Sequence, residues 1–265
     1  MSIRKKAQLP SVNILGSKVN LLNTPQVIDI MEEWINSENA TCRQIIVSGF
    51  HGILEGHKDT KLKNILNSAD LWVPDGIAPV AVARLKGHKN VSRTPGAEIM
   101  ESFLEVADKK GYSSYFYGDT DDTLEKLKTN LQIKYPGHRI AGMYSPPFRS
   151  LTNDEDDAIV EFINKTNPDI VWVGLGTPKQ DRWGFTHKDK LNTKIVIGVG
   201  AAFGFLAGKV QRVPKWIGNS GFEWVWRFAM EPKKLWRRDI IDGPRFLWYV
   251  GLELMNIKKY DYKQD

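Results

Sequence analysis

The sequence predicts an α/β fold, in which a largely parallel sheet is covered by helices on both faces. Short apolar runs alternate with segments whose apolar residues recur at helical spacing, and this alternation continues through most of the 265 residues. The run at 170–175 is nearly continuous, which is typical of a strand buried on both faces. Glycine or proline follows several of these runs, so the turns after the strands are expected to meet at one edge of the sheet.

The expected elements follow this order along the chain. Strands are expected at 12–15, 44–48, 71–73, 114–117, 139–142, 170–175 and 194–199. Helices are expected at 24–35, from the turn at 49–52 toward 66, at 80–85 and at 99–107. Further helices are expected from the turn at Asp119 through Leu131, at 158–163, and after Pro178. Thr24 and Thr152 are expected to cap two of these helices. The arrangement is Rossmann-like, and residues 1–208 are expected to form the α/β core.

Composition and charge are those of an ordinary globular chain with an excess of positive charge. Hydrophobic residues make up 42% and charged residues 26%, and the formal net charge of +6 favours an anionic partner such as a nucleotide, a phospholipid surface or a nucleic acid. The single cysteine, Cys42, excludes a disulfide or a cysteine-built metal site within one chain. Because we find no signal peptide and no run of ~18 apolar residues, we expect a cytoplasmic protein.

Two charged residues stand where a parallel sheet would place them near a ligand. Asp75 follows the expected strand at 71–73 and lies between a proline and a glycine. Its carboxylate would act as a general base, or it would simply cap the next helix. Arg93 precedes the helix at 99–107, where it would bind a phosphate or remain a solvated charge.

The turn after the run at 170–175 carries the densest polar chemistry. It reads GLGTPKQD from Gly174 to Asp181, and it is either a ligand site or an ordinary glycine–proline turn with a solvated helix start. A second glycine-rich turn at 198–204 has the spacing GxGxxxG but lacks the acidic residue of a dinucleotide fingerprint. We expect its glycines to let a ligand approach the backbone or a helix pack closely, and a nicotinamide or flavin oxidoreductase is the less favoured alternative.

The chain changes character after Gly208. Residues 209–263 hold 12 lysines and arginines against six acids, together with five of the nine tryptophans. This mixture suits a helix at a membrane interface, with its rings at the headgroup level and its cations on anionic lipid. A nucleic-acid surface, or an amphipathic subdomain docked on the core with solvated charges, would share the composition. Residues 209–265 are expected to form a helical appendage.

Five motifs taken together resemble the WecG/TagA/CpsF glycosyltransferases. They occur in the family's order between about Leu15 and Tyr260, and they are Pro74-Asp75-Gly76, Gly174 to Asp181, Gly198 to Phe203, Ala207 to Pro214 and Glu223 to Arg227. The resemblance implies an inverting, metal-independent hexosyltransferase without a cofactor. Its donor would be a UDP-sugar, either an N-acetylhexosamine, its uronic acid or a hexose. Its acceptor would be a polyprenyl-diphosphate-linked sugar in cell-surface polysaccharide or exopolysaccharide biosynthesis.

The motifs and the resemblance together assign expected roles to particular residues. Asp75 would be the catalytic base. The donor and its nucleotide would be bound by Arg93, Gly174, Gly176, Thr177, Lys179, Gln180 and Gly200. The diphosphate would be bound in the appendage by Arg227, Lys234, Arg237 and Arg238, the last compensating for a lysine where an arginine is usual. The appendage would complete the site and bind the inner face of the cell membrane peripherally. Nucleic acid is not an expected partner, and a homo-oligomer is left open.

Departures from the family pattern concern the substrate more than the reaction. Where many members have a Thr-Pro-Asn-Ala-type turn, this chain reads VSGFHG, so Ser48 and His51 are the candidates to stand in, and His51 is a rival candidate for the base. The aspartate often found after GxGxxF is Gly204, and Asp181 replaces a usual glutamate. Sugar specificity is therefore not fixed by the resemblance.

Overall fold

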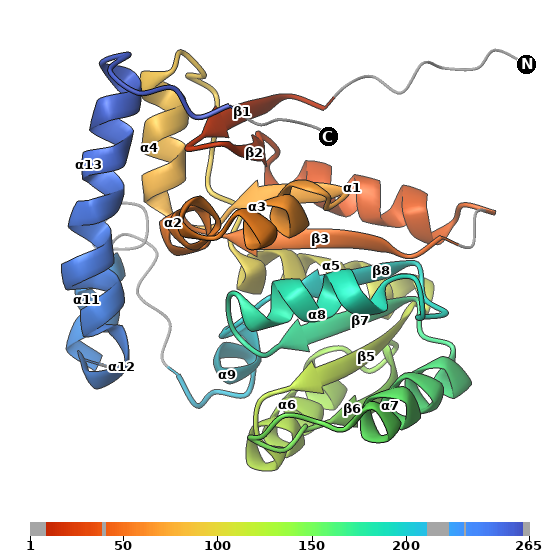
Figure 1. The fold of residues 1–265 in the computed structure, drawn as a ribbon. Coiled ribbons are helices and arrows are strands. Elements are labelled where there is room, and N and C mark those ends of the chain that lie inside the picture. The colour runs from red at the N-terminus through yellow and green to blue at the C-terminus, as the bar shows by residue number, and fades with distance from the viewer. Residues whose placement is uncertain (1–8, 39–40, 211–222, 231, 262–265) are drawn as a thin grey trace, which may run out of the picture.

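A parallel sheet forms the centre of the protein (Figure 1). The structure is a computed structural model that describes residues 9–38, 41–210, 223–230 and 232–261. Among these residues, six strands form the sheet in the order β4-β3-β8-β7-β5-β6, and every neighbouring pair is parallel. The strands are β3 (Arg43–Ser48), β4 (Leu71–Pro74), β5 (Ser113–Gly118), β6 (Arg139–Tyr144), β7 (Ile170–Gly174) and β8 (Ile195–Gly198). The predicted α/β fold is confirmed, and all six carboxyl ends lie at one edge.

Helices connect the strands and cover both faces of the sheet. They are α1 (Thr24–Ile35), α2 (Phe50–Lys58), α3 (Thr60–Asn67), α4 (Ile77–Leu85), α5 (Gly96–Lys110), α6 (Asp121–Lys134), α7 (Asn153–Thr166), α8 (Lys179–His187) and α9 (Ala202–Leu206). An antiparallel hairpin of β1 (Ser11–Ile14) and β2 (Ser17–Asn20) precedes α1.

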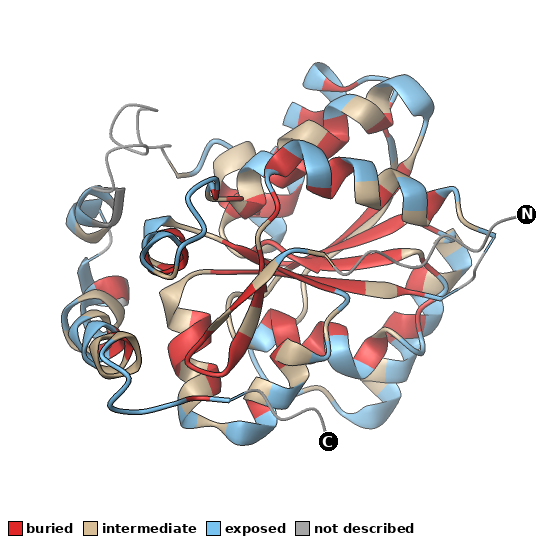
Figure 2. Cartoon of the chain, turned by 90° about the horizontal axis from the view of Figure 1, so that it is seen from above, coloured by how far each residue is buried: buried red, intermediate tan, exposed pale blue. Residues whose placement is uncertain are grey.

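The strands are buried because their side chains alternate between two helical layers. Trp172 of β7 belongs to a cluster with residues of α1, α5, α6 and α9, whereas Val171 and Val173 belong to a cluster with residues of α7 and α8. Figure 2 shows buried strands between helices whose outer faces are exposed. Burial on both sides explains why the strand sequences read as continuous apolar runs.

Side-chain caps decide where several helices begin. Thr152 caps α7 in a reciprocal capping box, as predicted. The expected threonine cap of α1 is wrong, because Asn23 is the cap and Thr24 is the first helical residue. The helix expected to continue toward 66 is interrupted at Asp59, whose carboxylate accepts two backbone N–H groups and starts α3.

The C-terminal helices lie on one side of the sheet, where the last two of them contact α2 (Figure 1). They are α11 (Glu223–Met230), α12 (Pro232–Trp236), the π-helix η1 (Arg237–Asp242) and α13 (Gly243–Leu254). Phe246 and Val250 of α13 are buried, and the ring centroid of Phe246 lies 5.7 Å from that of Phe50 in α2. The ring centroids of Tyr249 in α13 and His57 in α2 lie 4.6 Å apart. The expected domain boundary at 208 stays a prediction, since 211–222 lie outside the described residues.

Candidate active site

The turns after β3 and β4 touch, and they place Asp75 at the carboxyl edge of the sheet. The Asp75 N–H donates to the carbonyl of Ser48 at 3.1 Å. A Cβ on Gly49 would lie 2.6 Å from the carbonyl oxygen of Asp75, so this close approach requires glycine. The N–H of Thr94 donates to the carbonyl of Pro74 at 2.8 Å, which brings the neighbouring Arg93 to the end of β4. Asp75 and Arg93 therefore share one edge, as predicted.

Gln180 ties the turns after β7 and β8 together. Its Oε1 accepts hydrogen bonds from the N–H of Gly176 at 3.1 Å and from the N–H of Gly200 at 2.9 Å, and the residue is only 2% exposed. These two N–H groups were expected to cradle a nucleotide, and here they donate to Gln180 instead. Gln180 consequently shapes the site from inside, since a buried N–H without an acceptor is costly.

Close packing explains the other glycines of these turns. A Cβ on Gly174 would lie 2.7 Å from Cδ2 of Phe203, and a Cβ on Gly198 would lie 2.8 Å from Cγ of Gln180. The aspartate often found at the position of Gly204 would have its Cβ 3.2 Å from Cγ2 of Val210. Packing therefore explains the GxGxxxG spacing in this chain, and the spacing does not support a dinucleotide site.

Thr177 is half-buried and Lys179 is exposed, on either side of Pro178. The Thr177–Pro178 peptide bond is cis, and a Cβ on Gly52 of α2 would lie 3.5 Å from Cγ2 of Thr177. The turn after β7 thus lies close to the first turn of α2. Lys179, the first residue of α8, is exposed. The turns after β3, β4, β7 and β8 are thus linked in pairs along the carboxyl edge of the sheet.

Asp181 is a buried acid whose burial and protonation state the sequence did not predict. It is 1% exposed, and neither of its carboxylate oxygens has a hydrogen-bond partner among the described residues. Burial raises the pKa of Asp181 to about 8, so the carboxyl is neutral at pH 7. The only sequence signal is its position beside Gln180 on the face of α8 that also buries Gly184 and His187.

His51 lies in the first turn of α2, next to the C-terminal helices. Its pKa is lowered, first because of burial and despite the neighbouring carboxylates of Glu55 and Asp242. These three residues are close enough to share a metal ion, but the ammonium of Lys58 lies 2.9 Å from Glu55 Oε1 and 2.8 Å from Asp242 Oδ1. Lys58 therefore supplies positive charge at this point.

The expected diphosphate-binding residues are only partly described. Arg237 is exposed on η1. The guanidinium of Arg238 is engaged by its neighbour Asp239, with Nε 2.6 Å from Oδ1 and Nη2 3.0 Å from Oδ2. The side chains of Arg227 and Lys234 lie outside the described residues. The role of these four side chains stays a prediction.

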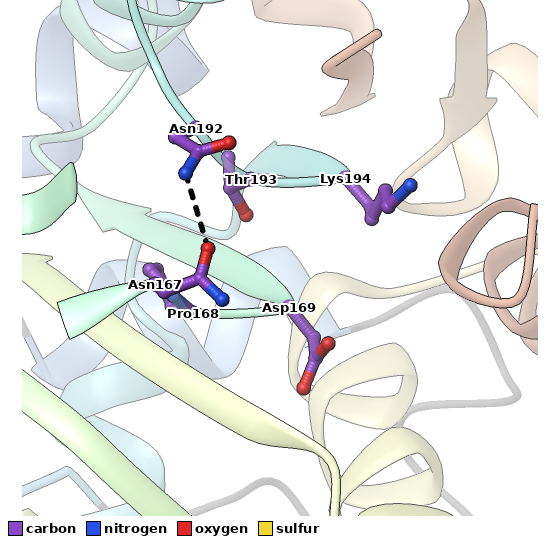
Figure 3. A pocket seen from close by; sticks show the side chains of 6 residues that line it. All are labelled: Asn167, Pro168, Asp169, Asn192, Thr193 and Lys194. Carbon is purple, nitrogen blue, oxygen red and sulfur yellow. Dashed lines mark hydrogen bonds between the residues drawn. The ribbon is translucent and has the colours of Figure 1, made fainter. Parts of the chain in front are cut away.

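A shallow pocket of about 120 Å³ lies at the opposite edge of the sheet (Figure 3). Its lining is Asn167, Pro168, Asp169, Asn192, Thr193 and Lys194, from the segments that precede β7 and β8. None of the predicted site residues is among them. The expected chemistry therefore lies at the carboxyl ends, where ligands of open α/β sheets bind.

By its fold, the protein is an open α/β protein, the class in which ligands usually bind beyond the carboxyl ends of the parallel strands. Residues 12–260 match the Glycosyl transferase WecG/TagA/CpsF family, and the chain belongs to that family. It is therefore a glycosyltransferase, as the motifs predicted.

Two relatives illustrate the similarity. The chain is 29% identical over 203 residues to the N-acetylglucosaminyldiphosphoundecaprenol N-acetyl-beta-D-mannosaminyltransferase of Bacillus subtilis (strain 168), which covers 77% of each chain. It is 24% identical over 259 residues to an enzyme of the same name from Staphylococcus aureus (strain MW2), which covers 98% of this chain and 99% of the relative.

Proposed function

We propose that this protein transfers a sugar from a UDP-sugar to a polyprenyl-diphosphate-linked sugar, with inversion at the anomeric carbon. The names of both relatives state transfer of an N-acetylmannosaminyl group to N-acetylglucosaminyl-diphosphoundecaprenol, so an N-acetylhexosamine is the donor sugar that they favour. The observation that carries the proposal is the convergence of Asp75, the turn at 174–181 and η1 around the start of α2.

Asp75 would remove the proton from the acceptor hydroxyl while the hydroxyl oxygen attacks the anomeric carbon. The bond from that carbon to the diphosphate breaks, and its electron pair leaves with UDP. Attack from the face opposite the leaving group inverts the configuration. His51, two residues after the glycine that approaches the backbone of Asp75, is the second group able to take this proton.

Cationic side chains would stabilise the negative charge that develops on the departing diphosphate. Lys179 is exposed at the start of α8, Arg93 lies beside the end of β4, and Arg237 is exposed on η1. Arg227 and Lys234 complete the set by their motif positions. This set would supply the charge that a metal ion provides in other transferases.

The C-terminal helices would bring the enzyme to its lipid-linked acceptor. No helix within the described residues is long and apolar enough to cross a bilayer. Large apolar side chains are nevertheless exposed along these helices and just after α13, at Val225, Trp226, Met230, Trp236, Ile240, Leu247, Trp248, Met255 and Ile257. Basic residues alternate with them in the sequence, so the helices would lie on an anionic membrane surface at the inner face of the membrane. Residues 209–265 would thus be an appendage that binds membrane and completes the site.

A transfer assay tests this function. The full chain is incubated without added divalent cations with UDP-N-acetylmannosamine, UDP-N-acetylglucosamine or UDP-glucose, and with a short-chain prenyl diphosphate that carries N-acetylglucosamine. We expect one donor to release UDP and to yield a disaccharide lipid of inverted anomeric configuration, identified by mass spectrometry and proton NMR. Retained configuration, or the absence of transfer from every donor, would contradict the proposal.

A further inference from the structure

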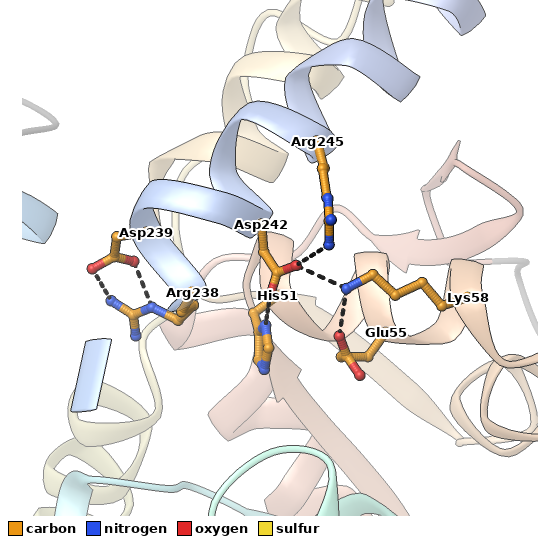
Figure 4. A network of polar contacts seen from close by, with 7 residues as sticks. All are labelled: His51, Glu55, Lys58, Arg238, Asp239, Asp242 and Arg245. Atoms are coloured by element: carbon orange, nitrogen blue, oxygen red, sulfur yellow. Dashed lines mark hydrogen bonds and ion pairs between the residues drawn. The ribbon is translucent and has the colours of Figure 1, made fainter. Parts of the chain in front are cut away.

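A polar network joins the C-terminal helices to α2 (Figure 4). Asp242, the last residue of η1, is 4% exposed. Its Oδ1 accepts a hydrogen bond from Nζ of Lys58, the last residue of α2, at 2.8 Å. Its Oδ2 lies 3.8 Å from Nδ1 of His51, the second residue of α2. One buried carboxylate therefore contacts both ends of the helix that follows β3.

His51 presents one ring nitrogen to this carboxylate and turns the other away (Figure 4). Nδ1 is buried and has no hydrogen-bond partner among the described residues, whereas the side chain as a whole is 30% exposed. A carboxylate beside Nδ1 favours the neutral tautomer that carries its proton on Nδ1. This tautomer leaves the lone pair on Nε2, which can then accept a hydrogen bond.

The position of His51 in the chain places the residue near two of the strand-end turns. Gly49, two residues earlier, touches the backbone of Asp75, and Gly52, the next residue, faces Thr177. His51 therefore stands between the turn that holds the expected base and the turn that holds the expected donor-binding residues. A sugar hydroxyl bound at either turn would be near α2.

We propose that Asp242 is a positioning residue, which fixes the tautomer and orientation of His51 so that Nε2 accepts a hydrogen bond from a substrate sugar hydroxyl. The inference rests on the proposed glycosyl transfer. It gives the C-terminal helices a task besides neutralising the diphosphate, because the carboxylate acts through His51 and does not touch the substrate. His51 would therefore be oriented only when the C-terminal helices are docked on α2.

The charges around His51 make the inference testable through its titration. Glu55 and Asp242 raise the pKa of His51, while Lys58 and Arg238 lower it, and burial has the largest effect and keeps the pKa below the ordinary value. Asp242→Asn removes a carboxylate and should lower the pKa further. Lys58→Met removes a cation and should raise it. Arg245 lies 3.8 Å from Asp242 Oδ1, so it pairs with the oxygen that does not face His51.

Nitrogen NMR of the full chain labelled at histidine tests the tautomer without any substrate, with the His51 signals assigned from His51→Asn. We expect wild-type His51 at about pH 7.5 to carry its proton on Nδ1 and none on Nε2. Asp242→Asn should lose this preference and show a lower pKa, and Lys58→Met should show a higher one. The matched control Arg245→Gln should keep the wild-type tautomer. A wild-type proton on Nε2, or an unchanged tautomer in Asp242→Asn, would overturn the inference.

The pH dependence of transfer to the short-chain acceptor supplies the second readout. Because only neutral His51 accepts a hydrogen bond, kcat/KM should fall at acid pH. This limb should lie at lower pH in Asp242→Asn and at higher pH in Lys58→Met, and Asp242→Asn should lose roughly tenfold in kcat/KM at neutral pH. Transfer with unmoved limbs in both variants would overturn the role of Asp242 and leave the proposed function intact. Absence of transfer in the wild type would overturn the proposed function. The tautomer of His51 would then still test the positioning role of Asp242.

Discussion

Gln180 and Asp181 are neighbours in the first turn of α8, and their buried side chains differ in hydrogen bonding. Gln180 satisfies two backbone N–H groups from separate turns, so it stabilises the shape of the site. Asp181 has no partner for either oxygen among the described residues, so it is best accommodated as a neutral acid. The motif predicted Gln180 as a donor-binding residue and gave Asp181 only as the replacement of a usual glutamate. The fold shows that Gln180 links two turns and that Asp181 is a buried acid.

Asp181 should make stability depend on pH. Its folded-state pKa of about 8 exceeds the value near 3.9 of an unfolded chain, so its contribution is fully present below about pH 4 and is lost as the pH rises to about 8. Asp181→Asn lacks this titration. Its free energy of unfolding relative to wild type should therefore increase with pH across this window, by up to about 1.4 kcal/mol per pH unit. Urea unfolding at several pH values measures the difference, and parallel curves would contradict a buried neutral acid.

At the scale of elements, a cap that the sequence identified offers a second test. The hydroxyl of Thr152 accepts the N–H of Glu155 at the start of α7. Thr152→Ala removes that acceptor and should lower the free energy of unfolding by about 1 kcal/mol. Thr152→Ser keeps a hydroxyl and serves as the control, with a smaller loss in the same urea experiment. Equal losses in the two variants would show that the methyl group, not the hydrogen bond, is responsible.

The strands and their order of appearance were predictable because burial on both faces leaves a continuous apolar run, as in β7. Parallel pairing then placed Asp75 and the turn at 174–181 at one edge. Helix starts were less predictable, because Asn23 and Asp59 act through side-chain hydrogen bonds that periodicity does not record. The contact of His51 with Asp242 was not predictable, since it depends on how helices distant in the sequence dock.

At the scale of the whole molecule, charge and aromatic content did not separate a membrane surface from a nucleic-acid surface. The motifs, which occur in the family's order along the chain, favoured a glycosyltransferase over a nucleic-acid-binding protein. The family match agrees with them. The C-terminal helices pack on α2 through Phe246 and Val250, and Leu247 and Trp248, the next positions around α13, are each 66% exposed. α13 is thus an amphipathic helix, whose inner face packs against the core and whose apolar outer face is exposed.

The proposed membrane binding rests on this outer face. Leu247→Glu combined with Trp248→Glu should weaken sedimentation with vesicles that contain anionic lipid by roughly tenfold or more, because burial of one large apolar side chain contributes about 1.5–3 kcal/mol. Phe148 follows β6, the outermost strand on the side of the sheet away from β3 and β4, and is 93% exposed. Phe148→Glu is therefore the matched control and should bind vesicles like wild type. Equal binding of the double variant and the control would contradict a membrane-facing α13.

Asp75→Asn is the most direct test of glycosyl transfer at the strand ends. Asparagine keeps the size of the side chain and removes the base, so kcat for transfer to the short-chain acceptor should fall by about 100-fold or more, with donor KM little changed. Asp119→Asn, at the end of β5, keeps the oxygen that accepts the N–H of Thr120 and should retain wild-type kcat. A kcat of Asp75→Asn close to that of wild type would contradict the assignment of Asp75 as the base.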